Sequence, residues 1–267
     1  MTTKSVSKKT KAEVGEVLDM DEWGGSPITS QDIVLPRILM MQPMSDMVTA
    51  GDAAFGDMVE SLGNKKLGDF KNALEIIPFY LQKVYVEYDI SLGTGQGEKK
   101  FLRMVPITAS NDNLPFDDEE LINGKATPIM RDRCMNYYVL IPTEVDNNTA
   151  IPHVLSFRRT SLKAGKKLAT QMYIKNKDAG LPPPAVMCSV SVEKTSNDKG
   201  TFAIMDVSFT EKTKTEHVAE CKRWIKLILA GEAKVHEADE DTATTGTTEQ
   251  APQAAPQAAT QAEPAQF

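Results

Sequence analysis

Apolar and polar positions alternate with a period of two along much of the chain from residue 74 onward. This period is typical of strands with one buried face, and the alternating stretches end at clusters of Gly, Asn and Asp. The last of these clusters, Asn197 to Gly200, supplies a glycine where a tight turn needs positive φ. Three strand pairs are expected on this basis: Val84–Ile90 with Phe101–Val105, Tyr137–Ile141 with His153–Phe157, and Val186–Glu193 with Thr201–Phe209.

A period near 3.6 residues replaces the alternation in two segments. Thr160 is a suitable N-cap for a helix that continues through Leu168 and Met172 to about residue 175. A second helix is expected over about Glu216–Leu229, where apolar residues form one stripe and Gly231 follows as a stop signal. Strands outnumber helices, so we expect a β-rich α+β domain, an elaborated OB-like barrel with two helices.

Composition divides the chain into three parts. Residues 1–30 are polar and contain a Gly-Gly-Ser-Pro break, which is typical of a flexible arm. Residues 31–232 hold the periodic segments and form the expected globular domain. Residues 233–267 are rich in Thr, Gln, Ala and Pro and cannot bury enough apolar surface to order themselves. We therefore expect disordered N- and C-terminal tails.

Charge is distributed unevenly along these parts. The net charge is −7, but six acidic residues and no lysine or arginine lie between Val235 and Phe267, so the rest of the chain is nearly neutral. Between Ile151 and Gly180, Asp178 is the only acid. On a helix, lysines three and four positions apart share a face that can follow a phosphate backbone, although a solvated surface is the alternative. The basic residues of this stretch are Arg158, Arg159, Lys163, Lys166, Lys167, Lys175 and Lys177.

Aromatic residues recur in the expected strands, close to further basic residues. Aromatic rings beside cations are typical of single-strand-binding surfaces, where bases stack on the rings and phosphates meet the cations. The alternative is a place in the core, which is commoner for aromatics in strands. Tyr85 and Tyr88 differ in parity and cannot face the same side of a regular strand. The candidates for contact with bases and backbone are Tyr85, Tyr88, Phe101, Arg103 and Tyr137.

The chain ends in Phe267, a single large apolar side chain after a long spacer. Such an end suits a pocket with an apolar floor and a basic rim on a partner protein, which makes Phe267 a candidate partner-binding residue. An inert solubilising extension is the alternative. Only Glu263 lies close to the end, whereas the denser acids lie at the start of the tail.

Other kinds of chemistry find little support in the sequence. The three cysteines and three histidines are scattered, so we expect no metal site, no cofactor and no enzymatic activity. The acidic run Asp117 to Glu120 is expected to be a solvated loop; an enzyme would need it to bind a divalent ion. The sequence shows no signal peptide and no apolar run long enough to span a membrane, so a cytoplasmic protein is expected.

Several short motifs resemble a group of early proteins of tailed bacteriophages. They are Leu35-Pro36-Arg37-Ile38, Phe55-Gly56-Asp57-Met58, Leu74-Glu75-Ile76-Ile77-Pro78, the stretch from Ser156 to Lys167, and Ser196 to Gly200. Together they span about residues 33–230. The resemblance implies a single-stranded-DNA-binding or replication and recombination accessory protein, acting in the infected host's cytoplasm.

The resulting hypothesis is non-sequence-specific binding of single-stranded DNA in phage replication or recombination, with self-association left open. Two alternatives remain. A phage structural or scaffold protein would explain the tail equally well without binding DNA. A strand-annealing recombination mediator would bind DNA similarly but would also speed the pairing of complementary strands.

Overall fold

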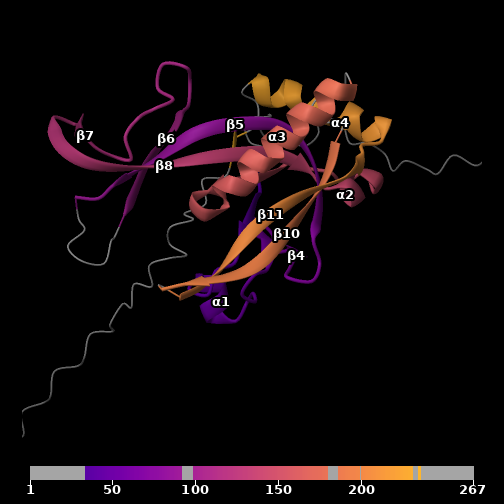
Figure 1. Ribbon diagram of the computed structural model, residues 1–267, viewed down its shortest axis with the longest axis horizontal. Coiled ribbons are helices and arrows are strands. Elements are labelled where there is room, and N and C mark those ends of the chain that lie inside the picture. Colours follow the sequence, from indigo (N-terminus) through magenta and orange to yellow (C-terminus); the bar gives the residue numbers. More distant parts are fainter. Residues whose placement is uncertain (1–33, 92–98, 180–185, 199, 231–233, 236–267) are drawn as a thin grey trace, which may run out of the picture.

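The computed structural model describes residues 34–91, 99–179, 186–198, 200–230 and 234–235 (Figure 1). It confirms the β-rich α+β class and both expected helices, which are α3 and α4. Two short helices, α1 and α2, were not expected, and α2 lies in the connection between β8 and β9. The helices within the described ranges are α1 (Asp46–Ala50), α2 (Pro142–Asp146), α3 (Leu162–Ala179) and α4 (Thr215–Leu229), with a 3-10 turn at Arg159–Ser161.

The strands form one large mixed sheet and a small parallel pair of β1 with β12. In the large sheet the order is β11-β10-β5-β8-β9-β2-β3-β4, with β6 beside β5 and β7 beside β8. All three expected strand pairs are confirmed as β5 with β6, β8 with β9 and β10 with β11. The strands are β1 (Val34–Leu35), β2 (Arg37–Met40), β3 (Met58–Glu60), β4 (Lys66–Gly68), β5 (Leu74–Asp89), β6 (Lys100–Pro106), β7 (Asp117–Ile122), β8 (Lys125–Leu140), β9 (His153–Arg158), β10 (Val186–Asn197), β11 (Gly200–Lys212) and β12 (Lys234–Val235).

Two strands of 16 residues, β5 and β8, run antiparallel through the whole molecule. At one end they lie in the body of the protein, between β10 and β9. At the other end they extend outward with β6 and β7 as a four-stranded projection, which we call the wing (Figure 1). Pro78 cannot donate a ladder hydrogen bond, and the pairing shifts register between Pro78 and Tyr80.

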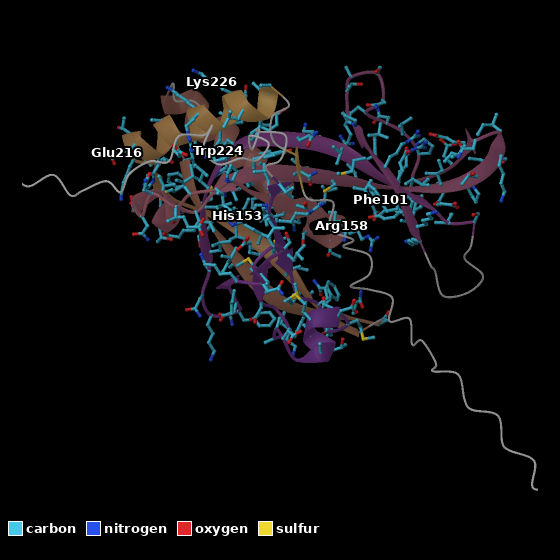
Figure 2. All side chains as sticks on the ribbon, turned by 180° about the vertical axis from the view of Figure 1, so that it is seen from behind. Phe101, His153, Arg158, Glu216, Trp224 and Lys226 are labelled. Atoms are coloured by element: carbon cyan, nitrogen blue, oxygen red, sulfur yellow. The ribbon has the colours of Figure 1, made fainter. Side chains whose placement is uncertain are left out.

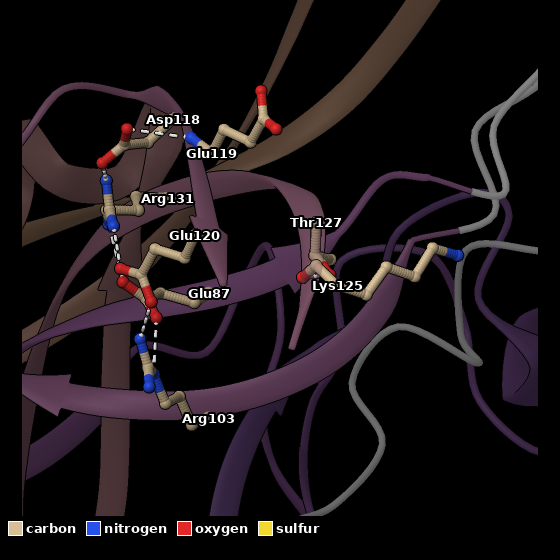
Figure 3. A network of polar contacts seen from close by, with 8 residues as sticks. All are labelled: Glu87, Arg103, Asp118, Glu119, Glu120, Lys125, Thr127 and Arg131. Carbon is tan, nitrogen blue, oxygen red and sulfur yellow. Dashed lines mark hydrogen bonds and ion pairs between the residues drawn. The ribbon is translucent and has the colours of Figure 1, made fainter. Parts of the chain in front are cut away.

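The wing is held by an ion network on one of its faces (Figure 3). Arg131, whose side chain is 2% exposed, bonds Glu87 at 2.6 Å, Asp118 at 2.5 Å and Glu120 at 2.5 Å. Arg103 bonds Glu87 at 2.7 Å and also reaches Glu120. A buried arginine is stable only when its charge is paired in this way. The residues of the network come from β5, β6, β7 and β8, so the network ties all four wing strands together.

Residues 117–120 belong to the strand β7 and not to the expected loop, although Asp117, Asp118 and Glu119 are exposed to solvent as expected. Asp118 and Glu120 alternate along the strand and therefore face Arg131 together, which lowers the pKa of Asp118. The strand turns into β8 through Asn123 and Gly124, both at positive φ, as a two-residue hairpin requires.

Helices cover both faces of the sheet in the body. The apolar face of α3 packs with Leu168 and Met172 into a core that includes Tyr137 and Phe157. On the opposite face, α4 packs Cys221 and Trp224 against residues such as Phe79 and Tyr138. The expected closed barrel is not found: among the described strands none joins β11 to β4. In a closed barrel one face of the sheet forms the interior and no helix can pack on it. Here α3 packs on one face and α4 packs on the other, so the sheet stays open.

The packing of α3 depends on a close approach at Gly165. A Cβ at this position would lie 2.7 Å from the Cβ of Phe157, and the Tyr137 hydroxyl donates a 2.8 Å hydrogen bond to the Gly165 carbonyl. Only glycine lets the helix lie this close to β8 and β9.

We predict that Gly165→Ala destabilises the protein. Alanine in a helix interior normally gains about 1 kcal/mol over glycine, but overpacking a core contact costs roughly 1–3 kcal/mol. The net loss in the free energy of unfolding should be about 1 kcal/mol and at most about 2 kcal/mol, measured by urea denaturation. Thr170→Ala, at an exposed position of the same helix, serves as the control and should leave stability within about 0.5 kcal/mol of the wild type.

Candidate nucleic-acid interface

The predicted basic stretch lies at the junction between the body and the wing. Strand β9 ends at Arg158, beside the base of the wing (Figure 2). Arg159 then takes a left-handed conformation, with φ at 49°, and the 3-10 turn leads into α3. Because the Arg159 side chain reaches back to Asp132 on β8 at 2.7 Å, the start of α3 is tied to the wing.

One face of α3 is exposed and carries cations together with one aromatic ring. Lys163, Lys166, Thr170 and Tyr173 follow one another at spacings of three and four residues, and all four are exposed. Residues at these spacings form a continuous line on a helix surface. Tyr173 is 66% exposed, and it lies at the far end of this line from Lys163. We call these four residues the α3 stripe.

The structure separates the paired cations from those that face solvent. Lys167 bonds the carboxylate of Asp206 on β11 at 2.8 Å, and this contact lowers the pKa of Asp206. The Arg158 guanidinium donates a 2.9 Å hydrogen bond to the Tyr88 hydroxyl. Lys163 and Lys166 make no direct ion pair with any residue in the described ranges, and Lys163 lies close enough to Asp206 to help lower the pKa of that carboxyl.

Two further predicted cations, Lys175 and Lys177, also belong to α3. Lys177 follows Tyr173 by four positions and therefore continues the line of the α3 stripe along the helix backbone. The side chains of both lysines lie outside the described part of the structure, as does Phe267 at the end of the chain.

The aromatic part of the prediction is corrected by the structure. Tyr85, Tyr88 and Tyr137 are 4%, 1% and 0% exposed, so their rings have no open face on which a base could stack. Phe101 is half-buried and packs edge-on against Tyr88, with ring centroids 6.5 Å apart. The reason is that packing covers both faces of the β5–β8 pair, on which the three tyrosines lie.

Arg103 also has a different place from the one expected. It is half-exposed, but Glu87 and Glu120 neutralise its charge within the wing network. Its predicted role as a phosphate contact is therefore replaced by a structural one in this conformation. One exposed ring that sequence reasoning missed is Tyr173, seven residues after Lys166 on the same helix. That spacing of about two helical turns places Tyr173 and Lys166 on the same face of the helix, so the sequence alone could have indicated this position.

Groups suited to other chemistry are few in the described ranges. Burial raises the pKa of Cys188 and of Cys221 to about 12, so both thiols stay protonated at neutral pH. Within those ranges no group of three or more His, Cys, Asp or Glu side chains could hold a metal ion. None of the helices described is both long and apolar enough to cross a bilayer.

Fold and site together define an α+β protein with an open mixed sheet, a projecting wing and a helix that presents a cationic stripe. A family model described as Pam3 phage gp34-like protein matches residues 7–234. The chain therefore belongs to this family of phage proteins. No curated protein and no solved structure matches the chain.

Asp206 gives a direct way to alter the charge of this surface. On the hypothesis that this surface contacts single-stranded DNA, we predict that Asp206→Asn tightens the binding several-fold at low salt, because it removes a negative charge and releases Lys167. Fluorescence anisotropy with an oligothymidylate measures the change. Glu211→Gln, an equal charge change at an exposed position near the end of β11, is the matched control and should have a smaller effect. Equal effects of both variants would contradict a local role for the α3 surface.

Proposed function

We propose that the protein binds single-stranded DNA without sequence preference, in phage DNA replication or recombination, and that the α3 stripe is its main contact surface. The observation that carries this proposal is the alignment of Lys163 and Lys166 with the exposed ring of Tyr173 on one helix face. The two lysines make no direct ion pair with any of the described residues, so both of their charges can interact with phosphates.

The chemistry of the α3 stripe suits a single strand. Two lysine ammonium groups and the positive end of the α3 dipole attract phosphates, and they do so whatever the base sequence. A tyrosine ring further along the helix offers a stacking face, which accepts any base. Arg158, held by the Tyr88 hydroxyl, adds positive potential at the start of the helix, whereas the charge of Arg159 is paired with Asp132.

The acidic tail fits the same function in a supporting role. Its acidic residues account for most of the net negative charge of the chain. They lie more than 60 residues after the α3 stripe in the sequence. Its terminal Phe267 is the proposed contact for replication or recombination proteins, as expected for an apolar end on a long spacer.

We predict that Lys163→Ala with Lys166→Ala weakens the binding of single-stranded DNA roughly tenfold or more at low salt. Each lost phosphate contact on a single strand lowers the slope of log K against log salt by about 0.7. The double variant should therefore lose about 1.4 from that slope, measured in titrations at several salt concentrations.

Lys222→Ala with Lys226→Ala is the matched control, because these exposed lysines belong to α4 on the opposite face of the sheet (Figure 2). It should keep wild-type affinity and slope. If both double variants lose the same slope, the protein binds polyanions through its general charge and the α3 stripe has no special role. Retention of full affinity by the α3 variant would contradict the proposed surface.

We predict that Tyr173→Ala weakens binding about 5- to 100-fold, because base stacking on an aromatic ring contributes about 1–3 kcal/mol. Tyr173→Phe keeps the ring and should bind like the wild type. The salt slope should stay unchanged in both, since neither variant removes a phosphate contact. A parallel loss in Tyr173→Phe would point to the hydroxyl group instead of stacking.

A further inference from the structure

A cavity of about 310 Å³ lies on the wing, close to its base. The segment between β6 and β7 forms one wall, with Leu114 and the 55% exposed ring of Phe116. Strands β5 and β8 form the other wall, with Tyr85 and Arg133. The cavity is thus lined by an open aromatic ring, an aliphatic side chain and a planar cation.

The segment that carries Phe116 is fixed to the sheet at several points. The Tyr85 hydroxyl donates to the Asp112 carbonyl at 2.8 Å, and Arg133 pairs with the carboxylate of Asp112. The backbone N–H of Arg131 donates to the Phe116 carbonyl at 2.7 Å. Because of these contacts the cavity is formed before any ligand arrives, and little ordering is needed on binding.

The cavity lies close to the start of the α3 stripe. Strand β8 pairs with β5 along one edge. Strand β9 and the segment leading into β7 both pair with β8 as well, so they share its other edge. On that edge Arg158 pairs with Cys134, and Phe116 bonds Arg131. Three residues of a strand span about 10 Å. The ring of Phe116 and the turn that begins α3 are therefore near neighbours along one edge.

We propose that this cavity binds one unpaired nucleobase of the strand whose phosphates contact α3. This inference rests on the proposed function and adds a second stacking contact, which accepts any base. The base would stack on Phe116, beside the guanidinium of Arg133, whose side chain is 36% exposed and is held in place by the carboxylate of Asp112.

Such a pocket has a consequence for selectivity. The lysines of the α3 stripe attract the phosphates of duplex and single strands alike. A base can enter a protein cavity only when it is unstacked and unpaired, which costs free energy in a duplex and little in a single strand. The cavity therefore adds to the preference for single strands that stacking on Tyr173 gives, a preference that the lysines alone lack.

The test compares an oligothymidylate with an abasic oligonucleotide of the same length, by fluorescence anisotropy at one salt concentration. Phe116→Ala should weaken binding of the oligothymidylate about 5- to 100-fold and leave binding of the abasic strand unchanged. Phe116→Leu fills the same space without an aromatic face and should behave like Phe116→Ala, whereas Phe116→Tyr should retain binding. Leu121→Ala, 79% exposed on the neighbouring β7, is the control and should bind both strands normally.

The outcomes separate this inference from the proposed function. If Phe116→Leu binds the oligothymidylate as the wild type does while Lys163→Ala with Lys166→Ala loses both strands, the base pocket is wrong and the α3 surface stands. Equal losses of both strands in Phe116→Leu would also overturn the pocket, because a stacking contact needs a base. If the wild type binds neither strand, the proposed function fails and the pocket fails with it.

Discussion

The antiparallel pairing of β5 with β8 is the contact on which the rest of the structure depends. Each strand has 16 residues, and their shared ladder extends from Ile77 and Leu140 in the body to Asp89 and Ile129 in the wing. Every other strand of the large sheet is added, directly or through a neighbour, to one of these two. The pair therefore fixes where the wing begins, and it also fixes where β9 and β7 meet the same edge of β8.

That shared edge explains why the candidate site lies where it does. Strand β9 stops at Arg158 and the segment before β7 starts to pair at Phe116, so a short stretch of β8 is left between them. The chain leaves the sheet there through Arg159 and enters α3, which packs on the body through Gly165. An interruption in strand pairing thus brings a cationic helix and an open cavity together.

Much of this architecture could be predicted from the sequence, because alternation and turn residues are local signals. The three hairpin pairs and the two long helices follow from them, as does the exposed position of Lys163 and Lys166. The closure of the sheet could not be predicted, since it depends on which faces the helices cover. The strand β7 was missed because Asp118 and Glu120 are typical of a solvated loop unless one knows that Arg131 lies opposite. Asn123 and Gly124 were the local signal for that hairpin.

The aromatic residues show why the site itself was only half predictable. A strand pattern reveals which residues share a face but not whether anything covers that face, and here packing covers both. Tyr85, Tyr88 and Tyr137 are consequently buried. In a helix that packs on a sheet, the periodic apolar residues mark the buried side, and the opposite side is exposed. The exposed position of Tyr173 could therefore be inferred from the sequence alone. For a strand-rich binding protein, exposed aromatics on helices and between strands are therefore better candidates for base contacts than those within the long strands.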